Sequence, residues 1–94
     1  MVKVLLNNKL TIKGVETNEI NIDFNNITGN TMIAAENEVR AMGDTTPSVF
    51  LSMRFQASLA AKIIGVTVDD IMALNGTDFK NIILPVANFL LSQD

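Results

Sequence analysis

Hydrophobic and polar residues alternate with a period of two over the N-terminal part of the chain. In the first run Leu10 and Ile12 alternate with lysine and threonine, and in a second run around Ile20 apolar residues alternate with asparagine and acidic residues. This period is typical of strands with one buried face. Gly14 separates the runs and suits a turn. The pattern predicts an antiparallel hairpin over about 3–24, with opposite charges facing each other on its exposed side.

After the hairpin the apolar spacing changes to three or four positions, which is the period of an amphipathic helix. Glycines and N-capping residues divide the rest of the chain into four segments. The predicted helices span about 29–42, 47–64, 68–74 and 78–92. Their predicted N-caps are Thr28 or Asn30, Thr46 (followed by Pro47), Thr67 and Thr77. Pro85 lies inside the last helix, so we expect a kink or a split there.

The segment 47–64 is the most apolar of the four, and we expect it at the centre of the fold. Small residues at positions 57, 58, 60 and 61 would let a neighbouring helix approach it closely. The chain has 94 residues, which leaves room for one hydrophobic core. We therefore predict a single α+β domain over 1–94, mainly helical, with an N-terminal β-hairpin followed by a cluster of about four α-helices.

Residues 59–76, LAAKIIGVTVDDIMALNG, have the outline of a helix-turn-helix. In DNA-binding versions the second helix enters the major groove, where basic or amide side chains read the bases. Here that helix offers Asp69 and Asp70 and no lysine or arginine. The chain has a net charge of −3 and a pI of about 4.7, so it repels phosphate backbones. We interpret the motif as a way of packing two helices, and a small helix-turn-helix regulator is the least favoured function.

Candidate catalytic residues are few, because the chain has no histidine and no cysteine. Asp69 and Asp70 are adjacent, so on a helix they point about 100° apart, and capping of the helix explains both. Glu36 and Glu38 meet the same objection. No serine lies at a telling spacing from a lysine such as Lys62. We expect no enzymatic activity, no metal and no cofactor.

The methionines and the apolar last helix raise the question of a binding surface. We expect Met32, Met42, Met53 and Met72 to fill the core rather than a groove. The last helix has more apolar side chains than it needs to dock on so small a domain. It is either a fully buried terminal helix or a partly exposed one, and exposed apolar patches usually mark a partner site. The candidate partner-binding residues are Phe79, Ile83, Val86, Phe89, Leu90 and Leu91.

The apolar stretches of the chain do not indicate a membrane protein. The N-terminal apolar run is short and is broken by Lys3, so we expect no secretory signal. The most apolar stretch, 49–68, is interrupted by Arg54, Gln56 and Lys62, which makes it too polar to cross a bilayer. An acidic chain is also not drawn to anionic lipid. We expect no membrane partner and no nucleic acid partner.

Three segments of the chain together resemble a known family. They are IDF-x-x-ITG at 22–29, AE-x-EVRAMGD-x-TP at 35–47 and GV-x-VDDI-x-AL-x-x-x-DF at 65–79. In this order, behind a hairpin and before an apolar last helix, they resemble the small tail assembly chaperones of long-tailed phages and prophages of Gram-positive bacteria. The resemblance covers about residues 10–92 and includes no catalytic motif.

The resemblance implies a non-catalytic chaperone that binds the tape-measure protein and keeps it soluble for assembly of the tail tube. Such a chaperone acts in the cytoplasm of the bacterial host, is absent from the mature virion and tends to form a homo-oligomer. Many members also exist in a frameshifted longer form, of which this chain would be the short version. From the residues we expect hydrophobic binding in the style of a helix in a groove. A structural minor tail protein of the virion is the main alternative.

Overall fold

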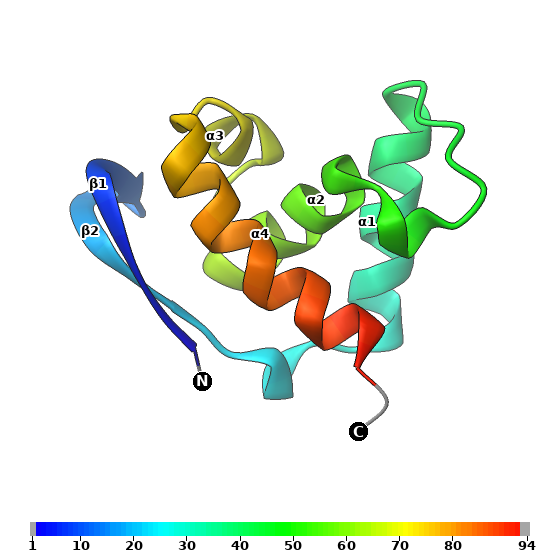
Figure 1. Cartoon of the computed structure of the whole chain (residues 1–94), viewed down its shortest axis with the longest axis horizontal. Coiled ribbons are helices and arrows are strands. Elements are labelled where there is room, and N and C mark those ends of the chain that lie inside the picture. The colour runs from blue at the N-terminus through cyan, green and yellow to red at the C-terminus, as the bar shows by residue number, and fades with distance from the viewer. Residues whose placement is uncertain (1, 93–94) are drawn as a thin grey trace.

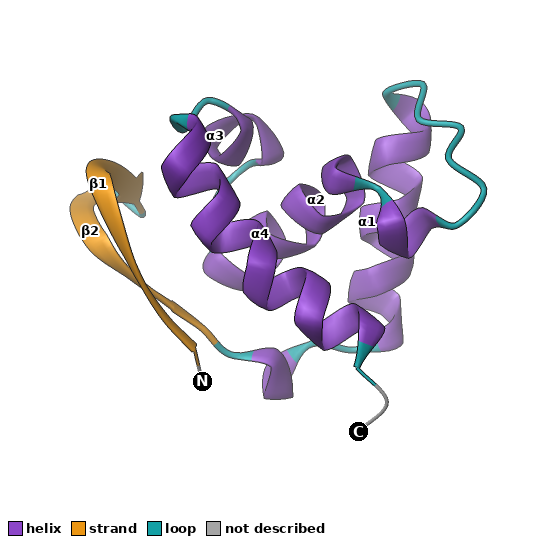
Figure 2. Ribbon diagram, in the orientation of Figure 1, coloured by secondary structure: helices purple, strands orange, loops and turns teal. Residues whose placement is uncertain are grey.

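The computed structural model describes residues 2–92 and confirms the predicted α+β class. An antiparallel hairpin lies beside a cluster of helices (Figures 1 and 2). The strands are β1 (Val2–Ile12) and β2 (Val15–Ile22). The helices are α1 (Gly29–Ala41), α2 (Met53–Ile64), α3 (Val68–Met72) and α4 (Gly76–Leu91), with the short 3-10 turns η1 (Phe24–Asn26) and η2 (Val49–Leu51).

The hairpin alternates as predicted. Leu10, Ile20 and Ile22 are buried and Ile12 is half-buried, whereas Thr11, Glu19 and Asn21 are exposed. On the exposed face Lys3 and Glu19 form a cross-strand ion pair, with Nζ and Oε1 3.1 Å apart. The hairpin therefore presents one face to the helices and a charged face to solvent.

A bulge in β1 was not predicted from the sequence. The register shifts between Leu5 and Leu10, where four residues of β1 (6–9) lie opposite a single residue of β2, Asn18. A bulge bends its strand and leaves backbone N–H groups without partners in the ladder. Asp78 of α4 accepts hydrogen bonds from two of these groups, so the bulge is also the point where the hairpin is fixed to the helices.

Helix α2 lies at the centre of the fold, as predicted, and packs against α1, α3, α4 and β2. Its small residues Ala57, Ser58, Ala60 and Ala61 are all buried. The largest fully buried apolar side chains are Phe55, Ile20, Ile22, Leu59, Ile71 and Ile82. They come from the hairpin and from α2, α3 and α4, so the hairpin and the helices share one hydrophobic core.

The predicted N-caps of α1 and α3 are confirmed. The side chains of Thr28 and Thr67 each accept a hydrogen bond from the third N–H of their helix. In return, the side chains of Thr31 and Asp70 accept hydrogen bonds from the backbone N–H groups of Thr28 and Thr67. Both helices begin where predicted and end one or two residues early. Gly65 ends α2 in the left-handed conformation, with φ at 96°.

The start of α2 was predicted wrongly. The pattern placed its N-cap at Thr46 and its first residue at Pro47, but the N-cap is Ser52, whose hydroxyl accepts from the N–H of Phe55. The reason is Asp44, whose carboxylate accepts hydrogen bonds from the N–H of Thr46 and the hydroxyl of Ser52. These bonds hold the segment as a loop that ends in η2.

The start of α4 was also predicted wrongly, and the helix is not split. Its N-cap is Asn75 rather than Thr77, because the Asn75 side chain accepts from the N–H of Asp78 at 3.0 Å. The helix continues through Pro85. A proline has no N–H to donate, so the carbonyl of Asn81 lacks its usual partner four residues on. The helix tolerates this beside an open groove that Asn81 and Pro85 both line.

Candidate functional site

The predicted partner-binding residues of α4 divide between the core and the surface. Ile83 and Val86 are buried, Val86 completely, so they present no surface to a partner in this structure. The half-buried residues are Phe79 and Leu90, which pack against the core, and the exposed ones are Phe89 and Leu91. The surface left for a partner is therefore the opposite side of the helix and its C-terminal turn.

Leu84 adds to this surface, although it was not among the predicted contacts. Its side chain is 52% exposed. It lies four residues before Asn88 and seven before Leu91, so the three share one face of the helix. Nearly every apolar residue of α4 was a plausible core residue from sequence alone. The packing of α4 against β1 and α2 decides which of them remain outside.

The methionines do not fill the core as predicted. Met32 is half-buried and packs against the core, but Met42, Met53 and Met72 are exposed. Isoleucine, leucine and alanine side chains and the ring of Phe55 take the central positions instead. Met42, Met53 and Met72 therefore belong to the surface.

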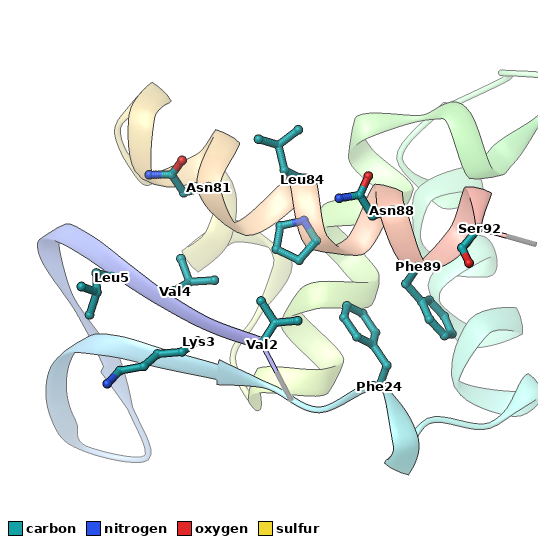
Figure 3. A pocket seen from close by; sticks show the side chains of 11 residues that line it. Val2, Lys3, Val4, Leu5, Phe24, Asn81, Leu84, Asn88, Phe89 and Ser92 are labelled. Atoms are coloured by element: carbon teal, nitrogen blue, oxygen red, sulfur yellow. The ribbon is translucent and has the colours of Figure 1, made fainter. Parts of the chain in front are cut away.

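A groove of about 730 Å³ separates β1 from α4 (Figure 3). Its apolar side chains come from both walls: Val2, Val4 and Leu5 from β1, and Leu84, Pro85 and Phe89 from α4. Asn81 and Asn88 add amides to the α4 wall. Lys3 is the one charged side chain among the described residues that line it. Mostly apolar linings with a few polar groups are typical of binding sites, which measure roughly 300–1,000 Å³.

The groove follows the free edge of β1. The opposite edge of this strand is paired with β2, and residues 2–92 add no third strand to the sheet. Val4 points to the inner face and Leu5 to the outer face, yet both line the groove, as expected for a groove that runs along an edge. Helix α4 packs beside β1 and forms the other wall (Figures 1 and 3).

An aromatic stack lies at one end of the groove. The rings of Phe24 in η1 and Phe89 in α4 are nearly parallel, with centroids 4.6 Å apart and an interplanar angle of 9°. Both rings line the groove (Figure 3). The stack ties the segment that follows β2 to the last turns of α4.

A buried carboxylate joins the two walls beyond the other end. Asp78, in the first turn of α4, accepts hydrogen bonds from the backbone N–H groups of Asn7 at 2.7 Å and Asn8 at 3.0 Å, and from the side-chain amide of Asn75 at 2.9 Å. The bond from Asn7 is the main cause of the lowered pKa of Asp78, and burial of the carboxylate opposes it. No local sequence signal indicates these partners, which are 70 and 71 positions away.

A serine and a lysine of α2 share one carboxylate of α1. Ser58 and Lys62 lie one turn apart on α2, and both donate to the same carboxylate oxygen of Glu38 on α1, the lysine at 3.2 Å. The bond from Ser58 is the main cause of the lowered pKa of Glu38. Ser58 is fully buried, so a substrate cannot reach its hydroxyl. The cluster fixes α1 against α2 and offers no accessible nucleophile.

The helix pair that resembles a helix-turn-helix is α2 and α3. The side chain of Asp70 caps α3 through the N–H of Thr67, at 3.1 Å, and both Asp69 and Asp70 are exposed. The surface of α3 is therefore acidic, which opposes contact with phosphates. This arrangement agrees with a packing role for the motif.

A second apolar patch lies between α1 and η2. Its exposed members are Ile33 and Phe50. Ile33 and Phe50 border a depression of about 620 Å³ whose floor includes Phe55. The ring of Phe50 stacks on that of Phe55 with centroids 5.7 Å apart. This second patch has no strand edge beside it, which distinguishes it from the groove.

Within residues 2–92 no helix combines the length and the hydrophobicity that a membrane span requires. In the same part of the chain, no three acidic side chains gather where they could hold a metal ion. The chain matches no protein-family model, no curated protein and no solved structure. The groove, rather than a likeness to a known protein, is therefore the strongest structural indication of function.

Proposed function

We propose that this chain is a non-catalytic tail assembly chaperone of a long-tailed phage, which binds the tape-measure protein and keeps it soluble while the tail tube is assembled. The structural observation that supports this proposal best is the groove between β1 and α4, where apolar side chains of both walls remain open to solvent on a small acidic domain. Exposed apolar surface of this kind is what a binding partner covers.

The family resemblance of the three sequence segments supplies the identity of the partner. A chaperone that binds the unassembled form of its partner keeps it soluble by mass action and needs no catalytic group. We place the protein in the cytoplasm of the bacterial host and outside the finished virion. Self-association and a longer frameshifted form also belong to this proposal.

The direct test is co-expression of this chain with the tape-measure protein encoded downstream. We expect the tape-measure protein to be insoluble alone and soluble in a complex with this chain, with the stoichiometry given by size-exclusion chromatography and light scattering. A tape-measure protein that stays insoluble in the presence of this chain would contradict the proposal. Peptides of this chain in purified virions would instead favour a minor structural protein of the tail.

Phe89→Asp tests whether the groove takes part. Phe89 is 38% exposed and its ring forms part of the groove wall, so a carboxylate there should weaken the complex by roughly tenfold or more. Helicity, measured by circular dichroism, should be preserved. The matched control is Ile33→Asp, which places the same charge on the second apolar patch and should leave the complex intact. An equal loss of complex formation in both variants would contradict binding of the tape-measure protein at the groove.

A further inference from the structure

We infer that the groove binds an extended, apolar segment that carries carboxylate side chains, and that this segment adds a strand to the free edge of β1. The inference rests on the proposed function: it specifies the surface that holds the tape-measure protein and the conformation in which a segment of that protein is held. It replaces the expectation of a helix lying in the groove.

The free edge of β1 provides the first argument. Between Val2 and Leu5 the strand pairs with β2 on one side only, so the backbone groups that point away from β2 face the groove. An extended segment can hydrogen-bond to these groups, whereas a helix has already used its own. Beyond Leu5 the bulge begins, and Asp78 takes the N–H groups of Asn7 and Asn8. The edge available to a partner is therefore short.

The position of α4 decides what kind of chain fits there. Because α4 packs on β1, a partner that pairs with the free edge has to share the groove with this helix, and a single strand is the least bulky element that can pair there (Figure 3). A hairpin of a second copy would bring its own helices to the same face of the sheet, where α4 already lies. A short segment of a longer partner meets no such obstacle.

The wall formed by α4 suits the side chains and the backbone of such a segment. Leu84 and Pro85 offer apolar contacts, and Asn81 and Asn88, two turns apart, offer amide donors and acceptors. Pro85 also leaves the backbone carbonyl of Asn81 without its helical donor. In an added strand, side chains alternate between the two faces, and those near α4 would meet this mixed wall.

Charge complementarity indicates carboxylates in the partner. Among the described residues, no carboxylate lines the groove, although the chain as a whole is acidic. Lys3 lines it, and more than half of the Lys3 side chain is exposed despite its bond to Glu19. Lys80 is exposed on α4 next to Asn81 and one turn before Leu84. With a lysine in its lining, a second one bordering it in sequence and no lining carboxylate, the groove favours a partner segment that carries carboxylates.

The test uses fluorescent peptides of about ten residues that together span the tape-measure protein, titrated against the full chain by anisotropy. We expect apolar peptides with acidic residues to bind, and Lys3→Glu and Lys80→Glu each to weaken them by about threefold to tenfold. Lys9→Glu is the matched control, because Lys9 lies on the same strand outside the groove and its substitution changes the net charge equally. Equal weakening by all three variants would contradict a local role of the groove.

Amide hydrogen exchange then decides the conformation of the bound segment. On peptide binding, the amides of residues 2–5 that point away from β2 should exchange several-fold more slowly. Peptides that bind in the groove without this protection would overturn strand addition and favour a helix. A soluble complex of the whole tape-measure protein in which no peptide binds the groove would contradict this inference and leave the proposed function standing. Failure to form any complex would contradict both.

Discussion

Two buried carboxylates stabilise this chain, and they act over very different separations in sequence. Asp44 accepts hydrogen bonds from the N–H of Thr46 at 2.8 Å and from the hydroxyl of Ser52. The Nη1 atom of Arg40 lies 3.9 Å from its Oδ1. All of these partners are within eight positions. Asp78 accepts from backbone groups 70 and 71 positions away. Asp44 therefore fixes a loop, whereas Asp78 fixes the hairpin against α4.

The difference shows that burial and hydrogen bonding do not by themselves tell which carboxylate matters for function. When a local contact is lost, the flanking helices still hold the loop ends close together. When the contact of Asp78 is lost, two backbone N–H groups in the bulge of β1 lose their acceptor, and the two walls of the groove lose their direct link. Loss of the Asp78 contacts should therefore change both the stability of the fold and the geometry of the groove, whereas loss of the Asp44 contacts should change stability alone.

The largest effect is expected from Asp78→Ala. It should lower Tm by roughly 10 °C or more, because an alanine leaves the N–H groups of Asn7 and Asn8 without an acceptor. It should also weaken binding at the groove. Asp78→Asn keeps one acceptor oxygen, so its Tm should lie between those of the alanine variant and the wild type. A Tm within a degree of wild type for both variants, measured by circular dichroism, would show that the hairpin is held by packing alone.

A smaller effect is expected from Asp44→Ala. Its Tm should fall by roughly 5 °C, because the partners of Asp44 lie in a loop where water can replace the lost acceptor. Faster amide exchange should be confined to about residues 44–52, and binding at the groove should not change. Faster amide exchange in β1 of this variant would contradict the conclusion that Asp44 fixes only its own loop.

The smallest effect concerns pH. Hydrogen bonds from Ser52 and then Thr46 lower the pKa of Asp44 to about 2 from its ordinary value of 3.8, and the pKa of Asp78 is also lowered. A lowered pKa in the folded state stabilises the protein above the unfolded value, and this contribution is lost as pH falls through the folded value. Tm should therefore change little between pH 8 and pH 5, where the chain has no histidine to titrate, and should fall from about pH 4 towards pH 2. Asp44→Asn should flatten this fall, and an unchanged profile would remove Asp44 as its source.

The elements that follow from local pattern were predictable from the sequence. The period of two predicted the hairpin, the change of period predicted the four helices, and Thr28 and Thr67 were correct caps because their partners are three residues away. The late start of α2 and the early start of α4 were missed, since the side chains of Asp44 and Asn75 compete with the predicted caps.

The site was harder to predict than the fold. The apolar excess of α4 predicted a partner surface on this helix, but Val86 is buried and Leu84 is exposed, and only the packing of the helix decides which side chains remain outside. The bulge of β1 and its link to Asp78 depend on contacts between the two ends of the chain. The groove itself exists only where β1 and α4 meet, so no single segment of the sequence contains it.

The most direct measurement compares two aspartate substitutions in co-expression with the tape-measure protein. Leu84 on the groove and Leu51, which lies in η2 outside the groove, are exposed to a similar degree, 52% and 61%, so each substitution should leave the fold intact. We expect Leu84→Asp to leave the tape-measure protein insoluble and Leu51→Asp to keep it in solution. A soluble complex with Leu84→Asp, or its loss with Leu51→Asp alone, would contradict binding at the groove between β1 and α4.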